Sequence, residues 1–337
     1  SRELGSVAAE VAAAATGGRL QAARLGLARL QRHSELAEVW AQLDEVAHTS
    51  FLGFGNPRAA ELAERLTAFF PSGSLERVFF SDDGSTAVEV AVKMAIQFRQ
   101  QSGEPERVGF IAFENAYHGD TMGAASLGGV SVFFDRFRSF GFRASRVTSL
   151  ADLRALPAEE VARAAAIVLE PLIQGVNEMR PWPAGQLAEI RSWCDGHGVH
   201  LILDEVMTGF GRTGTMFACQ QEEVIPDFLC LAKGLTGGYL PLAATLTTGR
   251  VFDAFLGGRE RTLNYGHSYT ANQLGCAAAL ASLRVFEEDR VLEKLPTRVE
   301  ALAQGLRAIT HSSVHEVRQC GLIAGLELRQ ESGERFS

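Results

Sequence analysis

Short apolar runs alternate with longer amphipathic segments through the middle of the chain. The apolar runs predict strands at Arg77–Ser81, Val108–Phe113, Ala165–Glu170, His200–Asp204, Phe228–Ala232 and Leu242–Thr247. Segments in which apolar residues return every three or four positions predict helices at Leu36–Ala47, Ala59–Phe70, Ser85–Gln101, Ala184–His197 and Asn272–Glu287. Continuously apolar strands between helices are typical of a mostly parallel sheet that is covered on both faces. The pattern therefore predicts a doubly wound α/β core, in which ligands bind at the carboxyl ends of the strands.

The two ends of the chain follow this pattern less closely. Residues 1–50 are rich in Ala, Arg and Leu and predict weak helices, and we expect an N-terminal segment that is divergent or incomplete. Residues 51–288 are expected to form the large domain. Residues 289–337 are expected to start a small α+β domain that looks incomplete, with a helix over Glu288–Ile309 and one or two strands within Val314–Leu328.

Charge and composition exclude several classes of protein. The 337 residues carry a formal net charge of −8, which argues against nucleic acid or an anionic membrane as the main partner. No apolar stretch approaches the length of a membrane span. The five cysteines form no CxxC spacing, so we expect thiols in a reduced, cytoplasmic compartment and no metal site. No GxGxxG follows the first predicted strand, which argues against a nicotinamide-dependent dehydrogenase.

Two of the predicted strands end at ionisable residues, Asp204 and Lys233. A buried acid and a buried amine are costly unless they are used or paired. Pyridoxal phosphate requires such a pair, because a lysine forms a Schiff base with its aldehyde and a carboxylate keeps its ring nitrogen protonated. Val206, two residues after the acid, would then lie against the face of the ring. The sequence therefore predicts a catalytic Asp204 and Lys233.

A Gly/Ser turn opens the helix after the first strand. Free N–H groups at a helix start bind phosphate, and Gly84 would let the anion approach closely while Ser85 adds a hydroxyl. A plain helix N-cap is the alternative. Ser268, in a loop before a small-residue helix, is a further candidate for the phosphate, or a solvated loop serine.

Other strand ends carry polar residues with two interpretations each. Tyr117 is a candidate for stacking on a cofactor ring, or an aromatic residue closing the core edge. Asp120 is a candidate for a substrate amine, or a cap. Glu170 is a candidate site acid, or a buried acid paired with a backbone N–H. Arg212 is a candidate for a substrate carboxylate, or the partner of Glu205 or another acid.

Taken together, these motifs resemble the class III pyridoxal-phosphate aminotransferases. The resemblance is carried by SDDGSTAVEVAVKMA, AYHGDT, LILDEVMTGFGRTG, FLCLAKGLTGGYLPLAATLTT and GHSYTANQLGCAAALASL. It covers about Leu36 to Leu328 and is strongest from Phe79 to Leu283. It implies a fold-type I transferase, with a mostly parallel sheet sandwiched by helices. Family members begin with a Trp-Trp pair and end with an arginine that both line the substrate pocket, and this sequence matches neither.

The resemblance also implies roles for single residues. The implied cofactor ligands are Gly84, Ser85, Tyr117, Asp204, Val206, Lys233, His267 and Ser268, and the implied substrate residues are Tyr117, Asp120, Arg212, Lys233 and Gly266. In this family the turn that matches His267 and Ser268 reaches the phosphate of the other subunit, which implies a homodimer.

Within the family, TGGYLPLAATLTT and GHSYT favour a transaminase of biotin biosynthesis. The implied reaction converts 8-amino-7-oxononanoate to 7,8-diaminononanoate, with S-adenosylmethionine or lysine as amino donor. Two alternatives stay open. One is another class III ω-aminotransferase that acts on ornithine, 4-aminobutyrate or a similar amine, and the other is a non-catalytic homologue.

Overall fold

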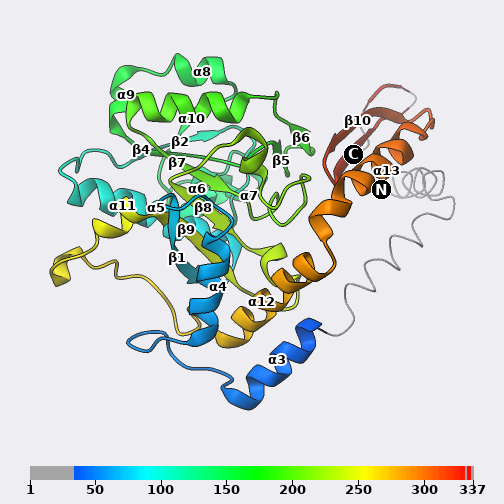
Figure 1. Cartoon of the computed structure of the whole chain (residues 1–337). Coiled ribbons are helices and arrows are strands. Elements are labelled where there is room, and N and C mark those ends of the chain that lie inside the picture. Colours follow the sequence, from blue (N-terminus) through cyan, green and yellow to red (C-terminus); the bar gives the residue numbers. More distant parts are fainter. Residues whose placement is uncertain (1–33, 331, 335–337) are drawn as a thin grey trace.

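A seven-stranded sheet forms the centre of the molecule (Figure 1). The structure is a computed structural model, and it describes residues 34–330 and 332–334. The helices expected before residue 34 lie outside the described residues. The strands of the sheet are β1 (Leu75–Ser81), β2 (Gly109–Phe113), β3 (Ser145–Val147), β4 (Ala164–Leu169), β7 (His200–Asp204), β8 (Phe228–Leu231) and β9 (Ala243–Thr248).

The sheet has the order β1-β9-β8-β7-β4-β2-β3. Strand β9 is antiparallel to both of its neighbours, while the pairs β8–β7, β7–β4, β4–β2 and β2–β3 are parallel. The predicted α/β core with a mostly parallel sheet is therefore confirmed. The sequence did not predict β3, a three-residue edge strand with a single buried residue.

Helices cover both faces of the sheet, because the strand side chains alternate between two apolar clusters. In β7, Leu201 and Leu203 belong to one cluster and Ile202 belongs to the other. The face of Ile202 is covered by α5 (Gly84–Gln101), α6 (Met122–Leu127) and α11 (Gly249–Asp253). The opposite face is covered by α4 (Pro57–Thr67), α8 (Leu150–Arg154), α10 (Gln186–His197) and α12 (Gln273–Glu288). Asp204 follows Ile202 by two positions and therefore points toward the α5 face.

The remaining elements lie around this core. They are α3 (Ser34–Glu45), which packs on α12, then α7 (Ser131–Phe134), α9 (Ala158–Arg163), and a small hairpin of β5 (Ile173–Gln174) and β6 (Arg180–Pro181). Among the described residues no helix has the length and apolar content that a bilayer crossing needs.

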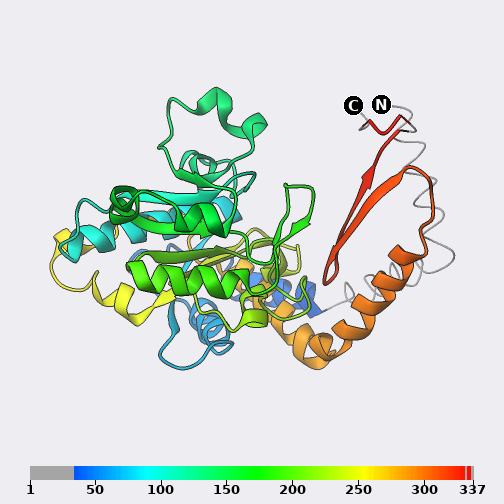
Figure 2. The same cartoon turned by 90° about the horizontal axis from the view of Figure 1, so that it is seen from above.

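A small C-terminal unit extends from the large body (Figure 2). It consists of α13 (Val291–Arg307) and an antiparallel hairpin of β10 (Val314–Cys320) and β11 (Ile323–Leu328). Two hydrogen bonds tie the hairpin to the large body, from Arg318 Nε to the Glu178 carbonyl (2.9 Å) and from the Leu322 amide to the Arg212 carbonyl (2.8 Å). The expected helix and strands are present, and the division into residues 1–50, 51–288 and 289–337 stays a prediction.

Candidate active site

Asp204 and Lys233 lie at the same edge of the sheet. Strands β7 and β8 are parallel neighbours, with Asp204 opposite Cys230, and Lys233 follows three residues later. The turn after Lys233 packs on the loop after Asp204, because a Cβ at Gly234 would lie 2.9 Å from Phe210 Cβ. The two predicted catalytic residues are thus brought to adjacent strand ends.

The environments of the two residues differ. Asp204 is buried, with 5% of its surface exposed, whereas Lys233 is exposed. The expectation of a buried amine is therefore wrong. The chain leaves the sheet at Ala232, and Lys233 has a φ of 45°, in the left-handed region that few non-glycine residues adopt. Such backbone strain occurs at functional sites when the surrounding structure holds it in place.

His118 is a further residue of the site, and no sequence motif predicts its role. Its Nδ1 lies 2.8 Å from Asp204 Oδ2, and the Val206 amide donates to Asp204 Oδ1 over 3.1 Å. His118 is 3% exposed, and its Nε2 has no hydrogen-bond partner among the described residues. Each oxygen of an ionised carboxylate has two lone pairs, so Asp204 has capacity for a further donor. The only sequence signal was its place directly after Tyr117 in a strand-end loop.

Glu170 lies beneath the same loop. It is 5% exposed, and its two oxygens accept from the amides of Tyr117 (3.3 Å) and Gly175 (2.9 Å). Burial raises the pKa of Glu170 to about 7, with a further increase from the charge of Asp204 and an opposing effect of His118. The interpretation of Glu170 as an acid paired with backbone N–H groups is confirmed.

The start of α5 confirms the N-cap interpretation of the Gly/Ser turn, and the phosphate interpretation stays a prediction. Asp83 is the N-cap, and it exchanges hydrogen bonds with Thr86 in a capping box. The first-turn amides at Gly84 and Ser85 lie at the position where a helix leaves N–H groups unpaired. A Cβ at Gly84 would lie 2.7 Å from Val206 Cγ1, so only glycine lets this turn approach the residue that follows Asp204 so closely.

Tyr117, Asp120 and Ser85 form one continuous polar surface. The Tyr117 hydroxyl donates to Asp120 Oδ2 over 2.9 Å, and the Asp120 amide donates to Ser85 Oγ over 3.1 Å. Burial, together with the hydrogen bond to Asp120, raises the pKa of Tyr117 to about 12. The Tyr117 ring lies 5.1 Å from the Phe133 ring between centroids. Tyr117 and Asp120, two predicted substrate residues, therefore adjoin a predicted phosphate ligand.

The loop of Gly266, His267 and Ser268 is exposed. His267 Nε2 lies 3.4 Å from Asp82 Oδ1 of the same chain, just before the start of α5. The loop is therefore exposed beside the Gly/Ser turn of the same chain.

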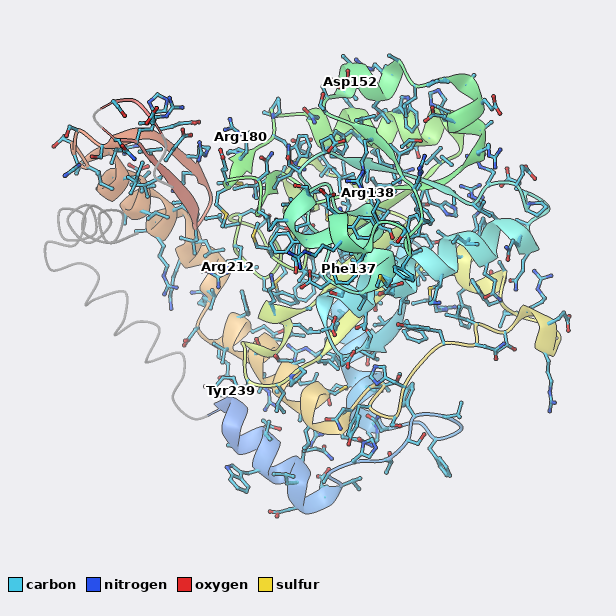
Figure 3. The ribbon with its side chains drawn as sticks, turned by 180° about the vertical axis from the view of Figure 1, so that it is seen from behind. Phe137, Arg138, Asp152, Arg180, Arg212 and Tyr239 are labelled. Carbon is cyan, nitrogen blue, oxygen red and sulfur yellow. The ribbon has the colours of Figure 1, made fainter. Side chains whose placement is uncertain are left out.

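Arg212 stands apart from the other predicted substrate residues. Its side chain is exposed on the loop that meets the β10–β11 hairpin (Figure 3). It has no ion pair within the part of the chain that the structure describes. The alternative pairing with Glu205 is wrong, because the carboxylate of Glu205 accepts from the amides of Ala218 (2.6 Å) and Cys219 (2.8 Å). The substrate role of Arg212 stays a prediction.

The donor set fits pyridoxal phosphate. Helix amides at Gly84 and Ser85 suit its phosphate, Asp204 has acceptor capacity for a ring N–H, and Lys233 supplies an accessible amine. Val206 lies between the Gly/Ser turn and Asp204, where it would contact the ring of the cofactor. No group of three or more metal-ligating side chains occurs in residues 34–330 and 332–334.

Comparison with known proteins agrees with this geometry. The sequence pattern of the class III aminotransferases matches residues 31–336. The chain is 48% identical to the adenosylmethionine-8-amino-7-oxononanoate aminotransferase of Nitratidesulfovibrio vulgaris, over 88% of this chain and 59% of that protein. It is 46% identical to the enzyme of the same name from Geobacter sulfurreducens, over 86% of this chain and 68% of that protein. The chain thus spans only part of the length of these relatives.

Solved structures give the same result. The adenosylmethionine-8-amino-7-oxononanoate aminotransferase of Methanocaldococcus jannaschii superposes with a TM-score of 0.87 at 38% identity, covering 91% of this chain and 73% of that chain. An amine transaminase from an uncultivated Pseudomonas species, in its PLP-bound form, superposes with a TM-score of 0.82 at 36% identity, covering 89% and 73%. The predicted fold-type I architecture is therefore confirmed.

Proposed function

Because the chain belongs to the class III aminotransferase family, we propose that it is a pyridoxal-phosphate-dependent transaminase of biotin biosynthesis. The reaction converts 8-amino-7-oxononanoate to 7,8-diaminononanoate, and S-adenosylmethionine or lysine is the amino donor. The observation that carries the proposal is the placement of Asp204 and Lys233 at adjacent strand ends, beside the start of α5. The names of the relatives support the choice of substrate.

Lys233 is the residue that binds the cofactor and moves protons. When bound, pyridoxal phosphate supplies an aldehyde that condenses with amines and a ring that takes up the electron pair left by a departing proton. Lys233 Nζ would remove the α-proton of the amino donor as a base and deliver it, as an acid, to the carbon that carried the aldehyde; in the second half-reaction the same amine would move a proton in the opposite direction. The chain has three lysines, Lys93, Lys233 and Lys294. Lys93 Nζ instead lies 5.1 Å from the centre of the Tyr265 ring, and Lys294 belongs to α13.

The remaining cofactor ligands act by position and charge. Asp204 keeps the ring nitrogen protonated, and His118 Nδ1 holds the Asp204 carboxylate in its orientation. The first-turn amides of Gly84 and Ser85 hold the phosphate. Tyr117 and Val206 would contact the ring.

The remaining groups of the site contact the substrate. Asp120 and Tyr117, which are hydrogen-bonded to each other, meet the amine end of the substrate. Arg212, exposed and without an ion pair among the described residues, meets a carboxylate. The Gly266 backbone completes the contacts.

We propose a homodimer in which His267 and Ser268 complete the phosphate site of the other subunit. Large apolar side chains are exposed in this loop, at Tyr269 (60%), and on a neighbouring segment, at Leu52 (89%) and Phe54 (71%). This segment is joined to the loop by the His48 and Tyr269 rings, 4.7 Å apart. An exposed apolar surface of this kind marks a contact with another chain.

Hybrid dimers test this arrangement. A Lys233→Ala subunit paired with a His267→Ala/Ser268→Ala subunit contains one intact site if the loop acts across the interface. Activity well above that of either homodimer is then expected. If the loop serves its own chain, as its 3.4 Å approach to Asp82 allows, the hybrid contains no intact site and activity stays low.

A half-reaction screen tests the function itself. The pyridoxal-phosphate-loaded protein is mixed with S-adenosylmethionine, lysine, ornithine or 4-aminobutyrate, and conversion of the cofactor to its amine form is followed by absorbance. Conversion by S-adenosylmethionine or lysine, followed by return of the spectrum with 8-amino-7-oxononanoate, is expected. Conversion by ornithine or 4-aminobutyrate alone would favour the other ω-aminotransferases, and no cofactor binding would favour a non-catalytic homologue.

We also propose a cytoplasmic location, which five unpaired cysteines, four of them buried, support.

A further inference from the structure

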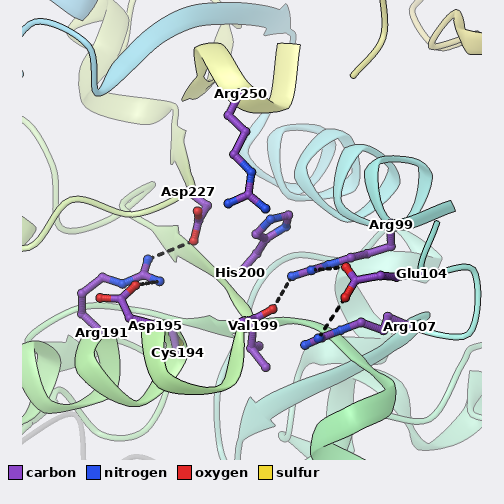
Figure 4. A pocket seen from close by; sticks show the side chains of 11 residues that line it. Arg99, Glu104, Arg107, Arg191, Cys194, Asp195, Val199, His200, Asp227 and Arg250 are labelled. Atoms are coloured by element: carbon purple, nitrogen blue, oxygen red, sulfur yellow. Dashed lines mark hydrogen bonds and ion pairs between the residues drawn. The ribbon is translucent and has the colours of Figure 1, made fainter. Parts of the chain in front are cut away.

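The two edges of the sheet are held in place by different contacts. At the amino ends of β7 and β8, ion pairs such as the one between Arg191 and Asp227 (2.9 Å) line a polar cavity of about 250 Å³ (Figure 4). At the carboxyl ends, the β10–β11 hairpin of the small C-terminal unit contacts the loop that follows Asp204. This second contact lies at the edge of the candidate active site and involves Arg212, a predicted substrate residue.

Arg212 and Thr213 are the central residues of a tight turn. The Gly214 amide donates to the Gly211 carbonyl over 3.1 Å, which closes a four-residue turn around them. Gly211 and Gly214 have φ values of 83° and 113°, so the chain bends sharply on both sides of the two central residues. Residues 211–214 belong to no helix or strand. Contacts with other segments therefore have to fix the conformation of this turn.

The tip of the β10–β11 hairpin supplies one of these contacts. Gly321 and Leu322 form the two-residue loop between the strands. The Leu322 amide donates to the Arg212 carbonyl over 2.8 Å. Gly321 has a φ of 59°, and a Cβ at its position would lie 2.5 Å from Thr213 Cα and 2.6 Å from the Arg212 carbonyl oxygen. Only glycine therefore lets the tip approach the turn so closely.

Two glutamines strengthen this arrangement. Gln221 Nε2 donates to the Thr213 carbonyl over 2.7 Å, so the next carbonyl of the turn is held as well. Gln319 Nε2 donates to the Gly321 carbonyl over 2.9 Å and to the Val299 carbonyl of α13 over 3.1 Å. The hairpin tip is therefore braced against α13 at the same time as it holds the turn.

The side chain of Arg212 is free where its backbone is not. It is exposed, and it has no ion pair within the described part of the chain. A guanidinium matches the two oxygens of a carboxylate, but binding such a ligand requires the groups that hold it to be ordered. A turn that is already fixed leaves only the side chain to be ordered, which lowers the cost of binding.

We propose that Gly321 and Leu322 are positioning residues for Arg212, because they fix the turn that carries its guanidinium and thereby set the affinity of the site for a substrate carboxylate. Their role rests on the substrate contact proposed above for Arg212. Coupling between two sites is reciprocal, so a carboxylate bound to Arg212 also stabilises the contact between the hairpin and the turn.

Gly321→Ala tests the proposal in a half-reaction. Protein that carries the amine form of the cofactor is mixed with 8-amino-7-oxononanoate or with its methyl ester, and single-turnover rates at a series of concentrations give an apparent Kd and a limiting rate. The variant should raise the Kd of the acid about tenfold and leave the limiting rate nearly unchanged, because the new Cβ displaces the turn of Arg212. The Kd of the ester, which lacks the charge, should stay at its wild-type value.

A contact that only joined the two parts of the chain would not distinguish the acid from its ester. An unchanged Kd for the acid, or an equal loss for acid and ester, would therefore overturn the proposal. Gly73→Ala is the matched control, because Gly73 also has a left-handed backbone, with a φ of 85°, but no atom within 4 Å of the added Cβ. The control should bind the acid like the wild type, and a loss as large as that of Gly321→Ala would count against the contact with the turn.

An Arg212→Ala background separates this proposal from the proposed substrate contact. There, Gly321→Ala should change the Kd of the acid less than about twofold, because no guanidinium remains to be positioned, and a further tenfold loss would refute the positioning role. If Arg212→Ala alone leaves the Kd unchanged, the substrate contact itself is wrong. If ornithine or 4-aminobutyrate is the substrate, the same comparison uses that amino acid, its methyl ester and the pyridoxal-phosphate-loaded protein.

Hydrogen exchange in the wild type does not depend on how the variants fold. The Leu322 amide reports the contact directly, since it donates to the Arg212 carbonyl. Exchange of this amide in the pyridoxal-phosphate-loaded protein should slow when the acid is added, and slow less when the ester is added. Exchange that is unaffected by the acid, or slowed equally by acid and ester, would overturn the proposal.

Discussion

Glu170 gives the fold a pH dependence whose size follows from the structure. Burial raises its pKa from 4.5 to about 7, and each pKa unit corresponds to about 1.4 kcal/mol. The folded state therefore binds this proton more tightly than the unfolded chain does. The stabilisation of the folded state by this proton is fully present below pH 4.5, decreases as the pH rises toward 7, and is lost above pH 7. The loss amounts to about 3 kcal/mol between pH 4.5 and pH 8.

Glu170→Gln isolates this contribution, because an amide does not titrate. Urea unfolding at a series of pH values gives the free energy of unfolding of the wild type and of the variant. The difference, wild type minus variant, should fall by about 3 kcal/mol from pH 4.5 to pH 8. In parallel, the infrared carbonyl band of a protonated carboxyl should disappear from the wild type near pH 7 and be missing from Glu170→Gln.

Glu159→Gln is the control, since it removes an exposed carboxylate from α9. Its difference from the wild type should not show this fall. A flat difference for Glu170→Gln over the same range, or a wild-type carboxyl band that is already absent at pH 5, would refute the reasoning that burial keeps Glu170 protonated.

Three further predictions concern the candidate active site. Asp204→Asn should retain the cofactor and lower kcat about 10²–10³-fold, measured at saturating substrate, because a stabilising charge is lost from the ring nitrogen; a wild-type kcat would contradict the assignment. His118→Asn should lower kcat roughly tenfold or more with little change in KM, because Asp204 loses its orienting partner, and an unchanged kcat would show that the 2.8 Å contact is dispensable. Gly84→Ala should weaken cofactor binding, measured by fluorescence titration, by about 1–3 kcal/mol, because the new Cβ would lie 2.7 Å from Val206 Cγ1. In a Val206→Ala background, which itself loses a contact to the ring, Gly84→Ala should cost much less affinity than it does in the wild type; an equal cost in both backgrounds would contradict the steric explanation.

The sheet was predictable from the sequence because its strands are nearly uniformly apolar and are separated by amphipathic helices. Strand β4 is buried along its whole length and needs no tertiary information to be recognised. In contrast, β3 contains Ser145 and Arg146 with only Val147 buried, so it has no apolar run and is defined by pairing with β2. Short helices such as α8 and α9 were missed for the same reason, since a single turn or two carries little periodicity.

The site residues were predictable only where an ionisable residue stands directly at the end of an apolar strand. Asp204 and Lys233 end apolar runs, and their residue types point to one cofactor. His118 contacts Asp204 from 86 positions away, and no local pattern reveals such a contact. Lys233 is exposed because the chain turns at its own position, where φ lies in the left-handed region. The apolar run before it does not predict this turn.

Identification of the lysine that carries the cofactor tests the central claim most directly. The pyridoxal-phosphate-loaded protein is reduced with borohydride, digested, and analysed by mass spectrometry, and the three lysines allow only three attachment sites. We predict the reduced pyridoxyl group on the peptide that contains Lys233, and none in a Lys233→Ala variant that keeps Lys93 and Lys294. Attachment at Lys93 or Lys294, or no stoichiometric attachment at all, would contradict the account.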